Sequence, residues 1–139
     1  FIAVNSIIFN NFTGYVFHDN YMLIYTGLAI SSIAISLFIS AKISLGVNYS
    51  HCYNQKKPYK IVDTGLYTLV RHPLYSSNIL LILSVLIISG SYLILINLFL
   101  IILFYTISAF REEKYLINRF PEYRVYSKKT GMFIPRYRK

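Results

Sequence analysis

Charged side chains are scarce in this chain of 139 residues. Lys, Arg, Asp and Glu together make up 14% of it, whereas a typical soluble domain carries about 25%. Between residues 73 and 110 none of the four occurs. Such a long charge-free run argues against an ordinary soluble domain and predicts helices that span a membrane.

Cysteine and acidic residues are also rare. The single cysteine, Cys52, excludes an intrachain disulfide and a multi-cysteine metal site. His51 stands beside it, but no further ligands follow at the spacing of a zinc site, so we expect no bound metal. Only five acidic residues accompany fourteen basic ones, which gives a net charge of +9.

The basic residues are confined to two blocks. All fourteen lie within residues 42–71 and 111–139, beside the apolar runs. Basic segments that flank apolar spans mark the cytoplasmic side of a membrane and its anionic lipid surface. We therefore expect both blocks to be cytoplasmic, with membrane lipids as neighbours. We expect no binding of nucleic acid despite the positive charge, because the charge follows the spans.

The apolar runs predict an all-α fold, a polytopic bundle of membrane helices in one domain, residues 1–139. The predicted spans are residues 1–17 (in part), 21–41, 74–88 and 92–110. Residues 21–41 would form about 31 Å of helix, which matches a hydrocarbon core of ~30 Å. Residues 73–110 as one helix would be about 57 Å long, nearly twice that thickness. Ser89-Gly90-Ser91 should therefore turn the chain and create a re-entering helical hairpin.

Small residues and a proline predict finer features. Small side chains let two helices approach closely in lipid, and the span 21–41 carries Gly27, Ser31, Ser32, Ser36 and Ser40. Lys42 should end this span. The last block, residues 111–139, should begin as helix and break at Pro121. Its aromatic residues alternate with Lys and Arg, which predicts an amphipathic cytoplasmic segment on the membrane surface.

One polar motif, Arg71-His72-Pro73-x-Tyr75, lies where the first basic block meets the third span. Spacing alone leaves two interpretations open. The motif is either a membrane boundary, in which Arg71 extends to the headgroups and Pro73 starts a helix, or a ligand site. In the second case the helix N-terminus, Arg71 and His72 would attract an anionic group. Tyr75 would then stack on the same ligand or hydrogen-bond it.

A second polar cluster directly follows the last span. Glu112 and Glu113 are two of the five acidic residues. They form either a solvated helical turn paired with Arg111 and Lys114, or a carboxylate site for a cationic or hydroxyl-bearing ligand group. Polar residues at the bilayer edge often mark substrate paths. As a ligand site, one glutamate should face the ligand and the other the surface, because adjacent helix positions point ~100° apart.

Taken in order, these motifs resemble the isoprenylcysteine carboxyl methyltransferase family, which is grouped with the phospholipid methyltransferases. The resemblance covers about residues 45–135. It rests on Thr64-Gly65-Leu66-Tyr67, Val70-Arg71-His72-Pro73-Leu74-Tyr75, Arg111-Glu112-Glu113, Tyr123-Arg124-Val125-Tyr126 and Thr130-Gly131-Met132-Phe133-Ile134-Pro135. The family implies a helical integral membrane enzyme that uses S-adenosylmethionine.

The resemblance also implies site residues. The motif positions assign cofactor binding to His72, Pro73, Tyr75, Glu112 and Glu113, with Arg71, Tyr123 and Tyr126 nearby, and we add Tyr105 as a further ring. We assign catalytic roles to Arg71 and Glu113. The chain departs from the family pattern at two places. Ser76-Ser77 stands where many members have a Gly, which would narrow the pocket, and Phe120-Pro121 replaces the usual Phe-Gly, which would tilt the terminal segment.

The implied chemistry suits these residues. Methyl transfer from a sulfonium is an in-line displacement, so the protein mainly positions donor and acceptor, which can supply ~7–11 kcal/mol. A carboxylate of the glutamate pair suits the ammonium or ribose hydroxyls of the donor, and Arg71 or His72 suits its carboxylate. The rings of Tyr75 and Tyr105 can meet the sulfonium by cation–π contact, worth ~0.5–2 kcal/mol. An acceptor amine must first lose a proton, and His72 is our candidate for that base.

The acceptor should carry an apolar tail, because a site beside a charge-free hairpin is reached from the lipid. We expect an integral membrane methyltransferase, in the inner membrane of a bacterium or the endoplasmic reticulum of a eukaryote, with its active site facing the cytoplasm. It would methylate a carboxylate, thiol or amine of a lipophilic molecule. Two alternatives remain open. Membrane sterol reductases share the Arg-His-Pro-x-Tyr region and use NADPH, whereas a small membrane protein without enzymatic activity would use its basic ends only to fix its topology.

Overall fold

The computed structural model describes residues 20–46 and 60–136. The predicted partial span at residues 1–17 and the His51-Cys52 pair lie outside these residues. The described elements are α2 (Tyr21–Leu45), a short 3₁₀ helix η2 (Gly65–Thr68), α3 (Pro73–Ser89), α4 (Tyr92–Arg119) and α5 (Tyr123–Lys129). Within the described part of the chain the only β pairing is an isolated parallel bridge between Val70 and Gly131. The all-α prediction is confirmed.

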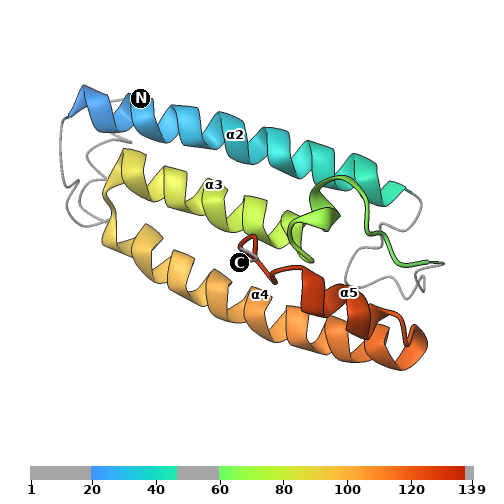
Figure 1. Ribbon diagram of the computed structural model, residues 1–139. Coiled ribbons are helices and arrows are strands. Elements are labelled where there is room, and N and C mark those ends of the chain that lie inside the picture. Colours follow the sequence, from blue (N-terminus) through green and yellow to red (C-terminus); the bar gives the residue numbers. More distant parts are fainter. Residues whose placement is uncertain (1–19, 47–59, 137–139) are drawn as a thin grey trace.

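Three long helices lie side by side, with α3 between α2 and α4 (Figure 1). The predicted turn between the last two spans is confirmed. Gly90 ends α3 in the left-handed conformation, with φ 59°, and its N–H donates to the carbonyl of Leu86. Glycine adopts this conformation without the steric cost that a Cβ brings. The chain therefore reverses within two residues, and α4 returns beside α3.

Both outer helices run beyond their predicted ends. The prediction that Lys42 ends α2 was wrong, since the helix continues to Leu45 and Lys42 lies in its last turn. A cation is favourable there because the carbonyl end of a helix is negative. Helix α4 continues as one helix from the charge-free residues 92–110 to Arg119. Its 28 residues make about 42 Å of helix, so its last turns extend beyond a ~30 Å hydrocarbon core.

Small residues bring α2 and α3 together, as predicted, although not all of the predicted ones take part. Gly27, Ala34 and Ala41 are the buried residues of α2. Ser31 Oγ lies 2.6 Å from Ser84 Oγ of α3, and Ser84 itself is fully buried. The remaining predicted serines of α2, which are Ser32, Ser36 and Ser40, are exposed. The contact is thus a stripe of small residues one heptad apart, which lets the two backbones approach closely.

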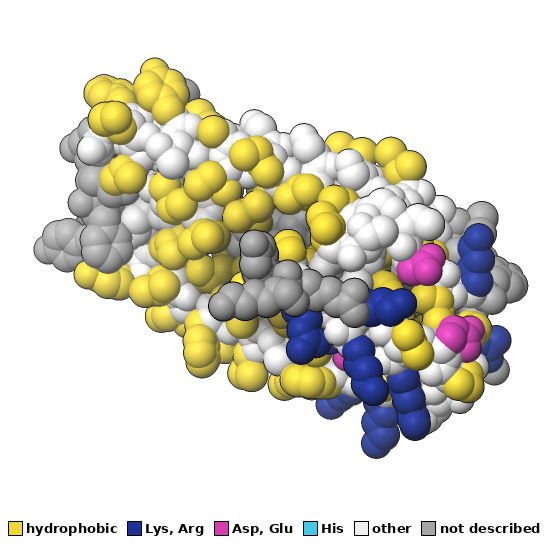
Figure 2. Space-filling model, in the orientation of Figure 1, with side chains coloured by type: hydrophobic (Ala, Val, Ile, Leu, Met, Phe, Trp, Pro, Cys, Tyr) yellow, Lys and Arg dark blue, Asp and Glu magenta, His cyan; other side chains and the backbone are white. Residues whose placement is uncertain are grey.

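The outer surfaces of these helices are apolar. Helices α2 and α4 are each long and apolar enough to cross a membrane, and α3 is a shorter apolar helix. Only 11% of the most apolar stretch is buried inside the molecule in either α2 or α4. The core helix of a soluble protein would be mostly buried, whereas here many large apolar side chains are exposed, and they gather over the part of the molecule away from α5 in Figure 2. Lipid is the surrounding that fits such a surface, and the fold is a membrane helical bundle.

Substitution of Gly27 tests the close contact between α2 and α3. A Cβ at this position would lie 2.4 Å from Ile88 Cγ1 and 3.0 Å from the carbonyl oxygen of Ser84. Gly27→Leu should therefore destabilise the fold by about 1–3 kcal/mol, the usual cost of overpacking, although leucine is the better helix former. Thermal unfolding in detergent measures the effect.

Ala29→Leu is the matched control, because Ala29 is exposed on the same helix. It should leave the unfolding temperature nearly unchanged. Equal unfolding temperatures for Gly27→Leu and Ala29→Leu would contradict the close packing of the two helices.

Candidate active site

The chain that precedes α3 is paired with the chain that follows α5. Beside the bridge between Val70 and Gly131, the N–H of Arg71 donates to Gly131 O at 2.8 Å and the N–H of His72 donates to Met132 O at 3.1 Å. Figure 1 shows this terminal segment returning across the end of the helices, between α3 and α4. The pairing places the Arg71-His72-Pro73 motif beside Gly131 and Met132, which lie at the other end of the sequence resemblance.

Arg71 makes the densest set of contacts at this end of the molecule. Its Nε lies 2.6 Å from Glu113 Oε1, and its Nη2 lies 3.4 Å from Glu113 Oε2. Its Nη1 donates to the carbonyls of Ser127, at 2.9 Å, and Thr130. Both members of the ion pair are nearly buried, with side-chain exposures of 11% and 12%. Arg71 therefore holds α3, α4 and the segment after α5 together.

His72 lies between the two carboxylates. Its ring Nε2 is 3.1 Å from Glu113 Oε1, and its Nδ1 is 3.5 Å from Glu112 Oε2. The histidine is buried, while the side chain of Glu112 is 48% exposed. An imidazole with protons on both nitrogens would donate toward both glutamates. Glu113 is thus nearly buried and Glu112 half exposed, and both contact the motif. Which of the two faces a ligand stays a prediction.

Three aromatic rings form a continuous stack beside this cluster. The rings of His72 and Tyr75 lie 5.3 Å apart and nearly parallel, and those of Tyr75 and Tyr105 lie 4.6 Å apart and nearly parallel. The Tyr75 hydroxyl donates to Glu112 Oε2 at 3.2 Å, and the amide of Asn78 donates to the Tyr105 hydroxyl at 3.1 Å. These spacings are those of favourable offset stacking. The stack joins the start of α3, through His72 and Tyr75, to Tyr105 of α4.

The electrostatics of the cluster favour an ionised Glu113, which lies beyond the charge-free part of α4. Partial burial raises the pKa of its carboxyl, but hydrogen bonds from His72 and Arg71 and their positive charges outweigh burial and hold the pKa below its usual value. On the nearby phenols burial acts in the same sense, and there it is not outweighed. It raises the pKa of Tyr126 to about 12 and also raises the pKa of Tyr123. Both phenols therefore stay neutral, and Tyr126 donates to the carbonyl of Tyr67 at 2.6 Å.

The structure brings all the residues of the two predicted motifs into one place. Arg71, His72, Tyr75, Glu112 and Glu113 form a single contacting cluster. Pro73 starts α3 beneath it and is buried, and Tyr105 extends it through the ring stack. The predicted anion site at the N-terminus of α3 is partly filled by the chain itself. The N–H groups of Tyr75 and Ser76 both donate to the carbonyl of His72.

The sequence analysis did not identify several residues that contribute to this site. Ser76, one of the two departures from the family pattern, donates from its hydroxyl to Phe133 O at 2.7 Å and so attaches the terminal segment to α3. The Phe133 ring lies against His72, with centroids 6.0 Å apart. Asn78 supports Tyr105. A polar side chain inside an otherwise charge-free span was the signal that could have drawn attention to Asn78.

Comparisons with known proteins show what the chain is similar to. Residues 20–123 match the model of the phospholipid methyltransferase family. A stretch of 82 residues is 35% identical to the cobalt-zinc-cadmium resistance protein CzcN of Cupriavidus metallidurans. That alignment covers 58% of this chain and 38% of the relative, so the chain spans less than two fifths of the length of this curated protein.

The ion pair can be tested by neutralising each glutamate separately. Glu113→Gln should lower the free energy of unfolding by about 3 kcal/mol, because it leaves the nearly buried Arg71 without a counter-charge. Glu112→Gln should have a small effect, since Glu112 is half exposed and makes the weaker contacts. Chemical denaturation in detergent compares the two variants. Similar losses in both would show that the Arg71–Glu113 pair does not carry the stability of this end.

Proposed function

Because the chain belongs to the phospholipid methyltransferase family, we propose that it moves a methyl group from S-adenosylmethionine to a lipophilic acceptor at the cytoplasmic face of the membrane. The acceptor group would be a carboxylate, thiol or amine. The observation that carries this proposal is the joining of Arg71, His72, Tyr75, Glu112 and Glu113 in one cluster at a single end of the apolar helices. A site there lies where a water-borne cofactor and a membrane-borne acceptor can meet.

The residues present fit the donor group. Glu112 is half exposed, and its contacts with Tyr75 and His72, at 3.2 and 3.5 Å, are long enough to leave its carboxylate accessible. A carboxylate in this position suits an ammonium group or ribose hydroxyls, with charge-assisted hydrogen bonds. The sulfonium of S-adenosylmethionine supplies an already activated methyl group. The protein then needs to hold donor and acceptor in line and exclude water, which is catalysis by positioning.

The geometry redistributes the roles expected for the other residues. Arg71 is engaged with Glu113 and two backbone carbonyls, so we propose that it positions the site instead of binding the donor carboxylate. The Tyr75 ring already stacks on His72 and on Tyr105. A cation–π contact is therefore assigned to Tyr105, which ends the stack. His72, buried between the carboxylates, remains the candidate base for an amine acceptor.

The proposed orientation rests on the charged surface. The end of the molecule near α5 carries most of the Lys and Arg side chains visible in Figure 2, while the other end is apolar. The exposed cations of this end include Arg111, Lys114, Arg119, Arg124, Lys128, Lys129 and Arg136. Basic residues next to membrane spans favour the cytoplasmic side. The acceptor would approach through the lipid, because the helices around the cluster expose apolar side chains.

Cofactor binding is the direct test of the proposed activity. Purified protein should bind S-adenosylmethionine in calorimetry, and Glu112→Gln should weaken that binding about tenfold or more, the effect of losing a charged hydrogen bond. Glu122→Gln serves as the control, since Glu122 is exposed and lies before α5. Equal affinity in wild type and Glu112→Gln would place the donor elsewhere. Binding of NADPH in place of S-adenosylmethionine would favour a reductase.

The orientation has its own test. With Cys52→Ser as background, a membrane-impermeant thiol reagent applied from outside should label Ser89→Cys, at the end of α3, and should not label Lys128→Cys, in α5. Lys128→Cys should become reactive once the membrane is permeabilised, which controls for its accessibility. The opposite labelling pattern would reverse the proposed topology.

A further inference from the structure

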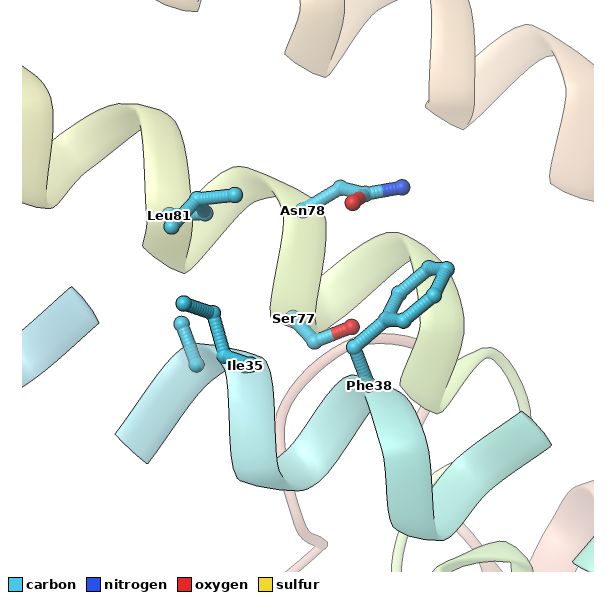
Figure 3. A pocket seen from close by; sticks show the side chains of 6 residues that line it. Ile35, Phe38, Ser77, Asn78 and Leu81 are labelled. Atoms are coloured by element: carbon cyan, nitrogen blue, oxygen red, sulfur yellow. The ribbon is translucent and has the colours of Figure 1, made fainter. Parts of the chain in front are cut away.

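A groove lies between α2 and α3, one to two helical turns below the motif. It has a volume of about 150 Å³ and is lined by Ala34, Ile35, Phe38, Ser77, Asn78 and Leu81. Figure 3 shows Phe38 and Asn78 toward one end of it and Ile35 and Leu81 toward the other. A largely apolar cavity of this size accommodates a group about as large as benzene.

One side chain links the upper end of the groove to the candidate active site. Asn78, which lines the groove, donates to the hydroxyl of Tyr105, and the Tyr105 ring stacks on Tyr75. Along α3, Asn78 lies about 4.5 Å and Leu81 about 9 Å from Tyr75, at ~1.5 Å per residue. A molecule whose reactive group lies beside Tyr75 would therefore extend its tail into the groove.

The lower end of the groove is closed by direct contact between the helices. One turn beyond Leu81, Ser84 Oγ lies 2.6 Å from Ser31 Oγ. Further on, Gly27 leaves too little space beside Ile88 even for a methyl group. Leu81 is therefore the last side chain before the two helices meet. By contrast, the groove is open at its side, where Ile35 is 49% exposed toward the surrounding lipid.

We propose that this groove binds the apolar chain of the methyl acceptor, and that Leu81 determines the longest chain that fits. The proposal rests on the proposed function, because it concerns the acceptor of that reaction. The occupant is a single hydrocarbon chain attached to the reacting group, since the groove starts next to the ring stack and ends at the Ser31–Ser84 contact. A bilayer lipid that entered the groove from its open side would show no chain-length limit set by Leu81.

The chain offers a convenient reporter for the test, because it contains no tryptophan. Phe38→Trp exchanges one aromatic residue of the groove for a unique fluorophore. We would titrate S-alkyl thioether carboxylates of increasing alkyl length into this variant in nanodiscs of neutral lipid. Affinity should rise about fourfold per added methylene, equivalent to ~0.8 kcal/mol, and then stop rising once the groove is filled.

Variants of Leu81 test whether this side chain sets the chain-length limit. In the Phe38→Trp background, Leu81→Ala should move the limit to chains about three carbons longer, since it removes that much side chain. Leu81→Phe should move it to shorter chains, so the test does not depend on one variant folding. Leu83→Ala is the matched control, because Leu83 is exposed on the same helix, and it should leave the limit unchanged.

The outcomes separate this proposal from the proposed function. An identical limit in the Leu81 and Leu83 variants, or an affinity that rises without limit as in simple partition into lipid, would overturn the groove assignment. The titrations contain no S-adenosylmethionine. A chain-length limit that changes in the Leu81 variants would therefore support the groove even if calorimetry showed no cofactor binding. If the limit stays the same in these variants, the groove assignment is wrong even when the protein binds the cofactor normally.

Discussion

Arg71 and Glu113 join three parts of the chain that lie far apart in sequence. The guanidinium contacts the carboxylate on α4 and two carbonyls of the segment around Thr130, while its own backbone pairs with Gly131 at the start of α3. Because both charges are nearly buried, removing either would leave the other without its counter-charge, which is costly. The position of His72 depends on the same pair, since its Nε2 meets the same oxygen of Glu113.

Helix length makes this pair possible. A helix that merely crossed the bilayer would end near residue 110, whereas α4 continues to Arg119. The extension carries Glu112 and Glu113 to the level at which α3 begins with Pro73. The tight turn at Gly90 sets the register, because it fixes where α4 starts relative to the end of α3. The site therefore forms because α4 extends beyond the length that crosses the bilayer, to the level at which α3 begins.

The sequence predicted the spans, the turn and the two motifs because each leaves a local signal: a charge-free run, a glycine between serines, or a cluster of polar residues. It could not predict which glutamate is buried or that Ser76 holds the terminal segment through Phe133 O. Those contacts join residues 41 to 57 positions apart, and the choice of Ser31 over Ser32 as the partner of Ser84 likewise depends on a distant residue. The spacing of residues shows which of them share a helix face, but which face makes the contact is known only once the neighbouring helix is placed.

Residue size along α2 and α3 divides their shared surface into two regions with different uses. Toward Gly27 and Ser84 the residues are small and the backbones meet directly. Toward the motif, the larger Phe38 and Leu81 stand beside buried Ala34 and Ser77, and the groove lies among them. Close packing in lipid stabilises the first region, and the second can remain open because the first fixes the helices. Asn78 lies where the open region meets the ring stack, so one amide group links the helix contact in the bilayer to the chemistry proposed at its surface.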